Sequence, residues 1–193
     1  GWLDLYVVNY RNATMRDEPD SPFDVKIKDG QYELVTYRGR PGNSPDLVGR
    51  FSFDRQAGVM ENGEADRLFL NTGGGSFQAV DWDEGIFIDS DRKAMSPPYD
   101  WGLSAMFRDL NGDGWPDLYV CNDFQSPDRV WINDGTGSFR PIRESAIRQT
   151  SLFSMGLDVA DINRDGHFDL FVADMLSPEH LDRHVQVMDG MAF

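Results

Sequence analysis

Two nine-residue stretches carry the side chains with the clearest chemistry in this chain. Residues 109–117 and 161–169 both place oxygen-bearing side chains at positions 1, 3, 5 and 9 and a glycine at position 6. Hard divalent cations such as Ca2+ bind oxygen atoms, and alternate residues of a tight loop can direct their oxygens at one centre. The predicted ligands, with the residue at position 7 supplying its backbone carbonyl, are Asp109, Asn111, Asp113, Trp115 and Asp117 in the first loop and Asp161, Asn163, Asp165, His167 and Asp169 in the second.

The pattern predicts two Ca2+ sites, one in each loop. Gly114 and Gly166 are expected at positive φ, because the chain reverses there and a residue with a Cβ is disfavoured in that conformation. The alternative is that both stretches are surface turns rich in Asp, Asn and Gly that bind no metal. The recurrence of the same ligand types in two copies favours the calcium interpretation.

The elements around the loops exclude the EF-hand motif. That motif requires a bidentate Glu at position 12 and a helix on each side. Position 12 is Val120 in the first loop and Val172 in the second, and the residues that follow each loop are mostly β-branched and aromatic, which is typical of strands. Each loop is therefore predicted to connect the two strands of a β-hairpin.

Composition limits the classes of protein that fit. The 193 residues are enough for one domain of ordinary size with its own core. The formal net charge of −15 and the pI near 4.4 argue against nucleic acid or an anionic membrane surface as a partner. A single cysteine excludes an internal disulfide framework, and no apolar run is long enough for a transmembrane segment.

The beginning of the chain repeats the end of each loop. Residues 1–9 align without a gap on residues 114–122 and on residues 166–174. The chain is therefore expected to be a fragment that begins at position 6 of a third loop. Asp4 would be the ninth ligand of that loop, and we do not expect it to hold a metal by itself.

A second repeated stretch indicates how the strands are grouped. Residues 66–77 match residues 128–139, and both consist of alternating apolar residues, a Gly-rich turn and a strand that opens with Ser-Phe. One repeat then contains four strands, at roughly 103–108, 117–122, 129–133 and 138–142. A four-stranded antiparallel unit that recurs about every 50 to 60 residues is typical of a β-propeller blade.

The predicted fold is all-β, a partial β-propeller of about three four-stranded antiparallel blades with calcium loops in the hairpins. Such a blade cannot bury its two faces alone, so neighbouring blades are expected to cover both. The apolar residues of the middle strands alternate as two sets, which are Leu118, Val120, Val130 and Ile132 in one and Tyr119, Cys121 and Trp131 in the other.

The chain divides into three predicted parts. Residues 1–99 form an incomplete blade with a long insertion at about 11–62, and residues 100–150 form a complete blade. Residues 151–193 form a partial blade with a helical or irregular C-terminal tail. An open arc of blades exposes apolar faces and strand edges, so aggregation or marginal stability is predicted for the isolated chain.

The insertion contains a predicted hairpin over residues 24–37, with a turn signal at its centre, followed by irregular chain over residues 38–45. Long insertions between strands often carry recognition, and the alternative is a passive surface excursion. The triplet that starts at Asn12 fits the N-glycosylation pattern, which is relevant only in a secreted eukaryotic protein.

Residues 109–124, followed by residues 128–139, resemble the FG-GAP/VCBS repeats of integrin-alpha-like propellers. More narrowly, residues 154–163 with residues 174–178 look like bacterial and animal proteins related to cartilage acidic protein, which carry an ASPIC/UnbV domain after their repeats. The resemblance implies a closed propeller of about seven blades, of which this chain would supply about three. The family's metal ligands fall on the same ten residues that the spacing selects.

Other candidate chemistry is sparse. His180 and His184 would share one face of a predicted helix, and the two alternatives are a zinc-binding pair and a solvated face, of which the solvated face is the simpler interpretation. Cys121 aligns with Val8 and Ala173, so we expect a small buried hydrophobic residue rather than a catalytic thiol. Several aromatic residues are expected to serve blade packing rather than to form a sugar platform, among them Trp101, Trp115 and Trp131.

Three functions from different classes fit this sequence. The first is a calcium-braced propeller of an extracellular, cell-surface or periplasmic protein that presents loops to a protein or carbohydrate ligand. The second is the non-catalytic scaffold portion of a secreted carbohydrate-active enzyme such as a lyase or dehydratase. The third is a purely structural spacer. No catalytic residues are predicted in this chain, and the remaining blades of the parent protein are expected partners.

Overall fold

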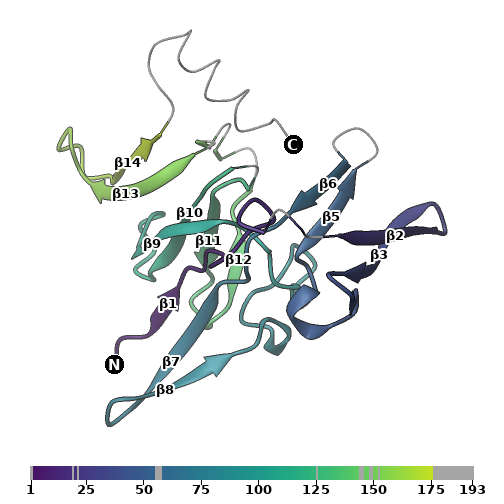
Figure 1. Ribbon diagram of the computed structural model, residues 1–193. Coiled ribbons are helices and arrows are strands. Elements are labelled where there is room, and N and C mark those ends of the chain that lie inside the picture. The colour runs from purple at the N-terminus through teal and green to yellow at the C-terminus, as the bar shows by residue number, and fades with distance from the viewer. Residues whose placement is uncertain are drawn as a thin grey trace, which may run out of the picture.

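The computed structural model describes residues 2–175 except 19, 21, 55–57, 125, 144, 145, 148, 149 and 152. The described residues form antiparallel β-sheets and two short 3-10 turns, and they contain no α-helix. In this part of the chain, no helix has the length and apolar character needed to cross a membrane. The all-β prediction is therefore confirmed for the described residues, and Figure 1 shows the sheets as separate units that do not join into a closed ring.

Three sheets contain the repeated sequence. The first sheet has the order β1-β7-β8, the second β12-β11-β10-β9 and the third β13-β14. The strands are β1 (Leu5–Val7), β7 (Arg67–Gly73), β8 (Ser76–Val80), β9 (Gly102–Arg108), β10 (Asp117–Asn122), β11 (Arg129–Asn133), β12 (Phe139–Pro141), β13 (Ser154–Ala160) and β14 (Asp169–Asp174). The four strands predicted between residues 103 and 142 are confirmed to within a residue or two at their ends.

The first and second sheets are built on the same register. Leu5 pairs with Phe69 between β1 and β7, and the aligned residue Leu118 pairs with Trp131 between β10 and β11. Both acidic stretches join antiparallel neighbours, β9 to β10 and β13 to β14, so each lies in a β-hairpin as predicted. The helical flanks that an EF-hand needs are therefore absent from both loops.

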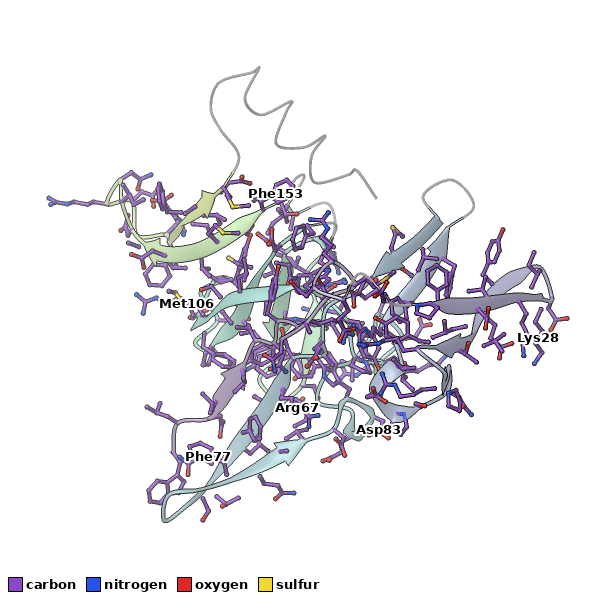
Figure 2. The ribbon with its side chains drawn as sticks, in the orientation of Figure 1. Lys28, Arg67, Phe77, Asp83, Met106 and Phe153 are labelled. Atoms are coloured by element: carbon purple, nitrogen blue, oxygen red, sulfur yellow. The ribbon has the colours of Figure 1, made fainter. Side chains whose placement is uncertain are left out.

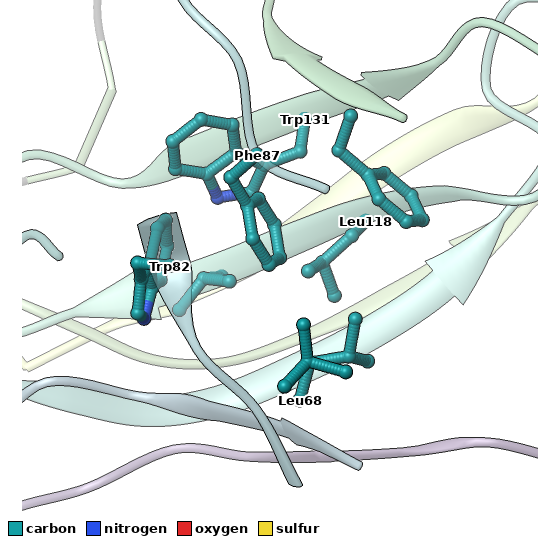
Figure 3. Packing of buried hydrophobic residues seen from close by; sticks show 8 residues of the cluster. Leu68, Trp82, Phe87, Leu118 and Trp131 are labelled. Carbon is teal, nitrogen blue, oxygen red and sulfur yellow. The ribbon is translucent and has the colours of Figure 1, made fainter. Parts of the chain in front are cut away.

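The second sheet is buried on both faces. On one face its residues pack against the first sheet and against the connection that contains the 3-10 turn η2 (Trp82–Glu84), as Figure 3 shows; the buried members of this cluster are Leu68, Val80, Trp82, Phe87, Leu118, Val120, Trp131 and Phe139. The opposite face packs against apolar residues of the third sheet and of nearby connections through Tyr119, Cys121 and Val130. The expectation that neighbouring units cover both faces is confirmed for this sheet.

The two alternating sets predicted from the sequence are regrouped by the strand register. Because Leu118 lies opposite Trp131 and Tyr119 lies opposite Val130, Trp131 joins the face of Leu118 and Val130 joins the face of Tyr119. The alternation within each strand was predicted correctly, but the combination of the two strands was wrong. Directly opposed residues share a face, and this relation follows from the pairing rather than from the spacing along the chain.

The insertion between β1 and β7 forms two small sheets of its own. The first has the order β2-β3-β4, from β2 (Phe23–Lys28), β3 (Gln31–Tyr37) and β4 (Arg40–Pro41), and its hairpin projects away from the other sheets in Figure 1. The second pairs β5 (Phe51–Asp54) with β6 (Gly58–Glu61), and the 3-10 turn η1 (Pro45–Leu47) precedes it. The predicted hairpin over residues 24–37 is confirmed.

The prediction of irregular chain over residues 38–45 is wrong in part, because β4 lies within it and η1 begins at Pro45. The β5-β6 pair was not predicted. Contacts between segments stabilise it: Arg50 and Glu61 form an ion pair of 2.7 Å, both side chains are largely buried, and the ring of Phe51 packs on Tyr37. Strands that are stabilised by contacts with distant residues need not show a regular alternation of apolar and polar residues in their own sequence.

Candidate functional site

The first acidic loop is folded around the carboxylate of Asp109. One oxygen of Asp109 accepts hydrogen bonds from the backbone N–H groups of Gly112 and Asp113, at 2.8 and 3.1 Å. The other oxygen accepts from the backbone N–H of Gly114 at 2.8 Å. The residue at position 1 therefore holds the loop in a tight curve, with its carboxylate at the centre of the turn.

Positions 3 and 5 of the same loop lie beside each other. The Nδ2 of Asn111 donates to Oδ2 of Asp113 at 2.9 Å, and Oδ1 of Asn111 accepts from the backbone N–H of Asp113. Oδ1 of Asp113 also accepts from the backbone N–H of Trp115 at 2.9 Å. The predicted ligands at positions 1, 3 and 5 are thus gathered on one short loop through shared hydrogen bonds with its backbone.

Asp117 connects the loop to the sheet. Its side chain is fully buried, its Oδ2 accepts from the backbone N–H of Leu110 at 2.9 Å, and its Oδ1 accepts from the backbone N–H of Asn133 at 2.9 Å. Burial raises the pKa of the Asp117 carboxyl, the two hydrogen bonds lower it, and the nearby Asp113 and Asp109 raise it. A buried carboxylate near two others is the arrangement that a bound cation would stabilise.

The second loop repeats this geometry. Asp161 accepts from the backbone N–H groups of Asp165 and Gly166 at 3.0 and 2.9 Å, and Asn163 Nδ2 donates to Asp165 at 2.9 Å. Further matching bonds run from His167 N–H to Asp165 and from Ile162 N–H to Asp169, both at 2.9 Å. Two sequences that share ligand types but differ at positions 2, 4, 7 and 8 therefore form most of the same loop hydrogen bonds.

Backbone conformation supports the role predicted for the glycine at position 6. Gly114 and Gly166 have φ angles of +90° and +89°, as expected for residues at the reversal. Position 4 is left-handed as well, with φ of +79° at Gly112 and +64° at Arg164. The sequence does not indicate this second left-handed position, because one copy has an arginine there.

The donor chemistry of both loops fits a hard cation. Each loop offers three carboxylates, one amide oxygen and backbone carbonyls, and such oxygen ligands suit Ca2+ rather than a softer transition metal. Among the described residues, no group of three His, Cys, Asp or Glu side chains converges closely enough to hold a metal as it stands. Cation binding would therefore require the side chains at positions 3 and 5 to exchange their mutual hydrogen bond for the ion.

Asp4 occupies the place of Asp117 in the first sheet. Its Oδ1 accepts from the backbone N–H of Asn71 at 2.8 Å, and the Nδ2 of Asn71 donates to the carbonyl of Leu3 at 3.0 Å. Asn133 makes the same two bonds in the second sheet. The alignment of the chain start with the two loops therefore extends to individual hydrogen bonds.

Two further acids, Asp66 and Asp128, were not predicted to have a role, although they are the first residues of the matching stretches 66–77 and 128–139. Asp128 is buried and accepts hydrogen bonds from Tyr119 Oη, from the backbone N–H of Asn122 and from Ser154 Oγ, at 2.8, 2.9 and 2.8 Å. Because Tyr119 belongs to β10 and Ser154 to β13, Asp128 links the second sheet to the third. The signal that could have identified it was the match of residues 66–77 with 128–139, in which Asp66 and Asp128 are the aligned first residues.

Asp66 is the counterpart of Asp128 in the first sheet. It accepts from Tyr6 Oη at 3.0 Å and from the backbone N–H of Asn9 at 2.8 Å, but Gly102 stands where Ser154 supplies the third donor to Asp128. Burial, which is the largest influence, raises the pKa of Asp66 to about 6. Asp66 therefore accepts one side-chain hydrogen bond fewer than Asp128.

A cavity of about 690 Å³ lies next to Asp66, between the insertion and the first sheet. Its walls come from Asn9 and Arg11, from η1 and Val48, from the segments 64–67, 80–83 and 94–97, and from Tyr99. They combine aromatic, acidic and basic side chains, of which Figure 2 labels Arg67 and Asp83; the others are Arg11, Asp46, Glu64, Asp66, Asp81, Trp82 and Tyr99. The cavity lies at the end of the first sheet where β1 ends and β7 begins. Asp4 and Asn71 lie at the opposite end of this sheet.

The other residues singled out in the sequence lie in different environments. Cys121 is fully buried and its pKa is raised to about 12 by burial, so the prediction of a buried hydrophobic residue is confirmed. Trp101 and Trp131 are buried as packing residues, whereas Trp115 is half exposed and lies against Gly135. Asn12 is exposed, and its glycosylation stays a prediction. His180 and His184 lie outside the described residues.

Comparison with known proteins identifies one similarity. Residues 109–172 match the family model described as FG-GAP-like repeat, and this segment includes both acidic loops. No curated protein and no solved structure matches the chain. The segment that carries the predicted metal ligands is therefore similar to an FG-GAP-like repeat.

Proposed function

We propose that this chain is part of a calcium-braced β-propeller that serves as a scaffold for ligand recognition. The observation that carries the proposal is the set of hydrogen bonds that the two acidic loops share, in a segment that matches an FG-GAP-like repeat. The ligands would be Asp109, Asn111, Asp113, Asp117 and the Trp115 carbonyl in the first loop, with Asp161, Asn163, Asp165, Asp169 and the His167 carbonyl in the second.

The bound ions would act as structural braces. Three carboxylates on one short loop repel one another, so a cation would favour the closed loop. If each site has the affinity of extracellular calcium modules, with a Kd of about 10⁻⁴ M, millimolar Ca2+ would stabilise each loop by about 1.4 kcal/mol. Calcium at that concentration is available outside the cytosol, so we propose an extracellular, cell-surface or periplasmic location.

Recognition would occur at the end of the sheets opposite the calcium loops. The insertion and the 690 Å³ cavity are both at that end, and the cavity presents charged groups together with Trp82 and Tyr99. Mixed polar and aromatic walls suit a carbohydrate or a polar segment of a protein. The scaffold and the ligand site would then be separated, with Ca2+ at one end stabilising a recognition surface at the other.

Calcium titration by calorimetry tests the brace. We expect two sites in the unaltered chain and one in Asp113→Ala and in Asp165→Ala, because each substitution removes one carboxylate from one loop. The control is Asp91→Ala, which removes an exposed carboxylate outside both loops and should leave two sites. A stoichiometry that does not change in either loop variant would refute the ligand assignment.

A glycan array and an affinity capture experiment on the full chain test recognition separately. Arg67→Ala and Asp83→Ala alter the cavity without touching either loop and should reduce ligand binding while calcium stoichiometry stays at two. Loss of binding in the loop variants alone, with no effect of the cavity variants, would place the recognition surface elsewhere.

A further inference from the structure

The strand β2 is an edge strand that is exposed along its whole length. All six of its residues are exposed, and the sheet order β2-β3-β4 leaves one side of its backbone without a neighbouring strand among the described residues. Figure 1 shows the β2-β3 hairpin projecting from the body of the molecule, and Figure 2 labels Lys28 near its tip. An exposed edge of this kind is a template for pairing with another strand.

The two faces of β2 differ in chemistry. Phe23, Val25 and Ile27 lie on one face, with exposed fractions of 37%, 37% and 66%, and they stand opposite apolar or aromatic residues of β3. The other face carries Asp24 and Lys26 in alternation with them. The irregularity between β2 and β3 adds its extra residue to β3, so β2 itself keeps a regular alternation.

We propose that β2 is a dimerisation edge that pairs antiparallel with β2 of a second copy of this chain, about a two-fold axis at Val25. An isologous interface requires a strand that is complementary to itself in reverse order. With the axis at Val25, Asp24 lies opposite Lys26 of the other copy, and Phe23 lies opposite Ile27. The charges and the apolar residues are then both matched.

Neighbouring registers lack this complementarity. An axis at Asp24 places two aspartates opposite each other, and an axis at Lys26 places two lysines opposite each other, which destabilises a strand pair. An axis between two residues would place polar residues of one strand directly opposite apolar residues of the other, on the same side of the joint sheet. The sequence of β2 therefore selects one register for self-pairing.

The hairpin already holds these charges in place. Lys26 forms an ion pair of 3.2 Å with Glu33, and Asp24 accepts a hydrogen bond from Thr36 at 2.9 Å. In the dimer, Lys26 of one copy would lie between Glu33 of its own chain and Asp24 of the other. The interface is small, so the association is expected to be weak and dependent on concentration.

Disulfide trapping of the full chain gives the sharpest test. In Val25→Cys the two thiols face each other across the axis, within the Cα separation that a disulfide accepts, so mild oxidation should yield a covalent dimer. In the matched control Ile27→Cys the two thiols lie about 14 Å apart along the strands and should not cross-link. The native Cys121 is fully buried and should not interfere.

Charge substitutions test the same register without cysteines. Asp24→Lys should weaken the dimer at least tenfold in sedimentation equilibrium, whereas Lys28→Asp, which lies outside the matched pairs, should leave it unchanged. A chain that stays monomeric at high concentration, equal cross-linking of both cysteine variants, or dimerisation that Asp24→Lys does not affect would overturn the proposal. Circular dichroism of each variant establishes that the fold is retained.

Discussion

The buried carboxylate of Asp117 accepts a hydrogen bond from the backbone N–H of Asn133 at 2.9 Å, which ties position 9 of the first loop to the strand β11. The same carboxylate holds Leu110 at the start of the loop. One side chain therefore couples the proposed metal loop to the sheet that forms the centre of the core. In the second loop, the equivalent bond from Ile162 to Asp169 is present, but Asp169 is only partly buried.

This difference predicts unequal costs of substitution. We expect Asp117→Asn to lower the free energy of unfolding by about 1–3 kcal/mol even without calcium, because an amide nitrogen cannot accept the bond that one carboxylate oxygen now makes. The matched substitution Asp169→Asn should cost less. Urea unfolding in the presence of a chelator measures both, and equal costs would contradict the coupling described for Asp117.

Arg164 adopts φ of +64°, whereas the equivalent position in the first loop is Gly112 at +79°. A residue with a Cβ is disfavoured by about 1–2 kcal/mol in this conformation. Arg164→Gly is therefore expected to stabilise the chain by a fraction of that amount, since glycine also gains freedom in the unfolded state. Gly112→Arg, measured in the same thermal unfolding assay, should be destabilising, and a destabilised Arg164→Gly would refute the argument.

Asp66 should make stability depend on pH. Its pKa in the folded chain is raised to about 6 by burial, from an ordinary value of 3.8, so the folded state binds a proton more readily than the unfolded state between those values. Stability from this group is therefore highest below about pH 4 and falls as the pH rises through about 6, by at most about 3 kcal/mol.

Asp66→Asn should remove this part of the pH dependence. The amide can still accept from Asn9 and can donate to the Tyr6 hydroxyl, so both contacts can be kept. Urea unfolding at pH 4.5 and pH 7.5, compared between the unaltered chain and the variant, measures the difference. Asp91→Asn is the control, and a variant with the same pH dependence as the unaltered chain would contradict the assignment to Asp66.

Ser154 joins two sheets through its hydrogen bond to Asp128, at 2.8 Å and with both residues buried. Ser154→Ala should lower the free energy of unfolding by about 1–3 kcal/mol, because a buried carboxylate loses one of its three donors. The exposed Ser76→Ala serves as the control and should change stability little. Hydrogen exchange in β13 should also increase in Ser154→Ala, and unchanged protection there would count against the link between the sheets.

Features that depend on local spacing could be predicted from the amino-acid sequence. The alternation of apolar residues indicated the strands of the second sheet, and the glycine at position 6 predicted the reversals at Gly114 and Gly166. Repetition indicated that residues 109–117 and 161–169 would fold alike, since the same residues at the same spacing can form the same hydrogen bonds within a short loop.

Features that depend on pairing between distant segments could be seen only in the folded chain. The register of β10 with β11 placed Trp131 with Leu118, and the packing of β5 and β6 against Tyr37 formed a sheet that the local pattern did not predict. The repeat showed that Asp66 and Asp128 occupy equivalent positions, but it did not show which groups they bind. Their chemistry comes from burial and from donors such as Tyr6 and Ser154, which are far away in sequence and are brought near only by the fold.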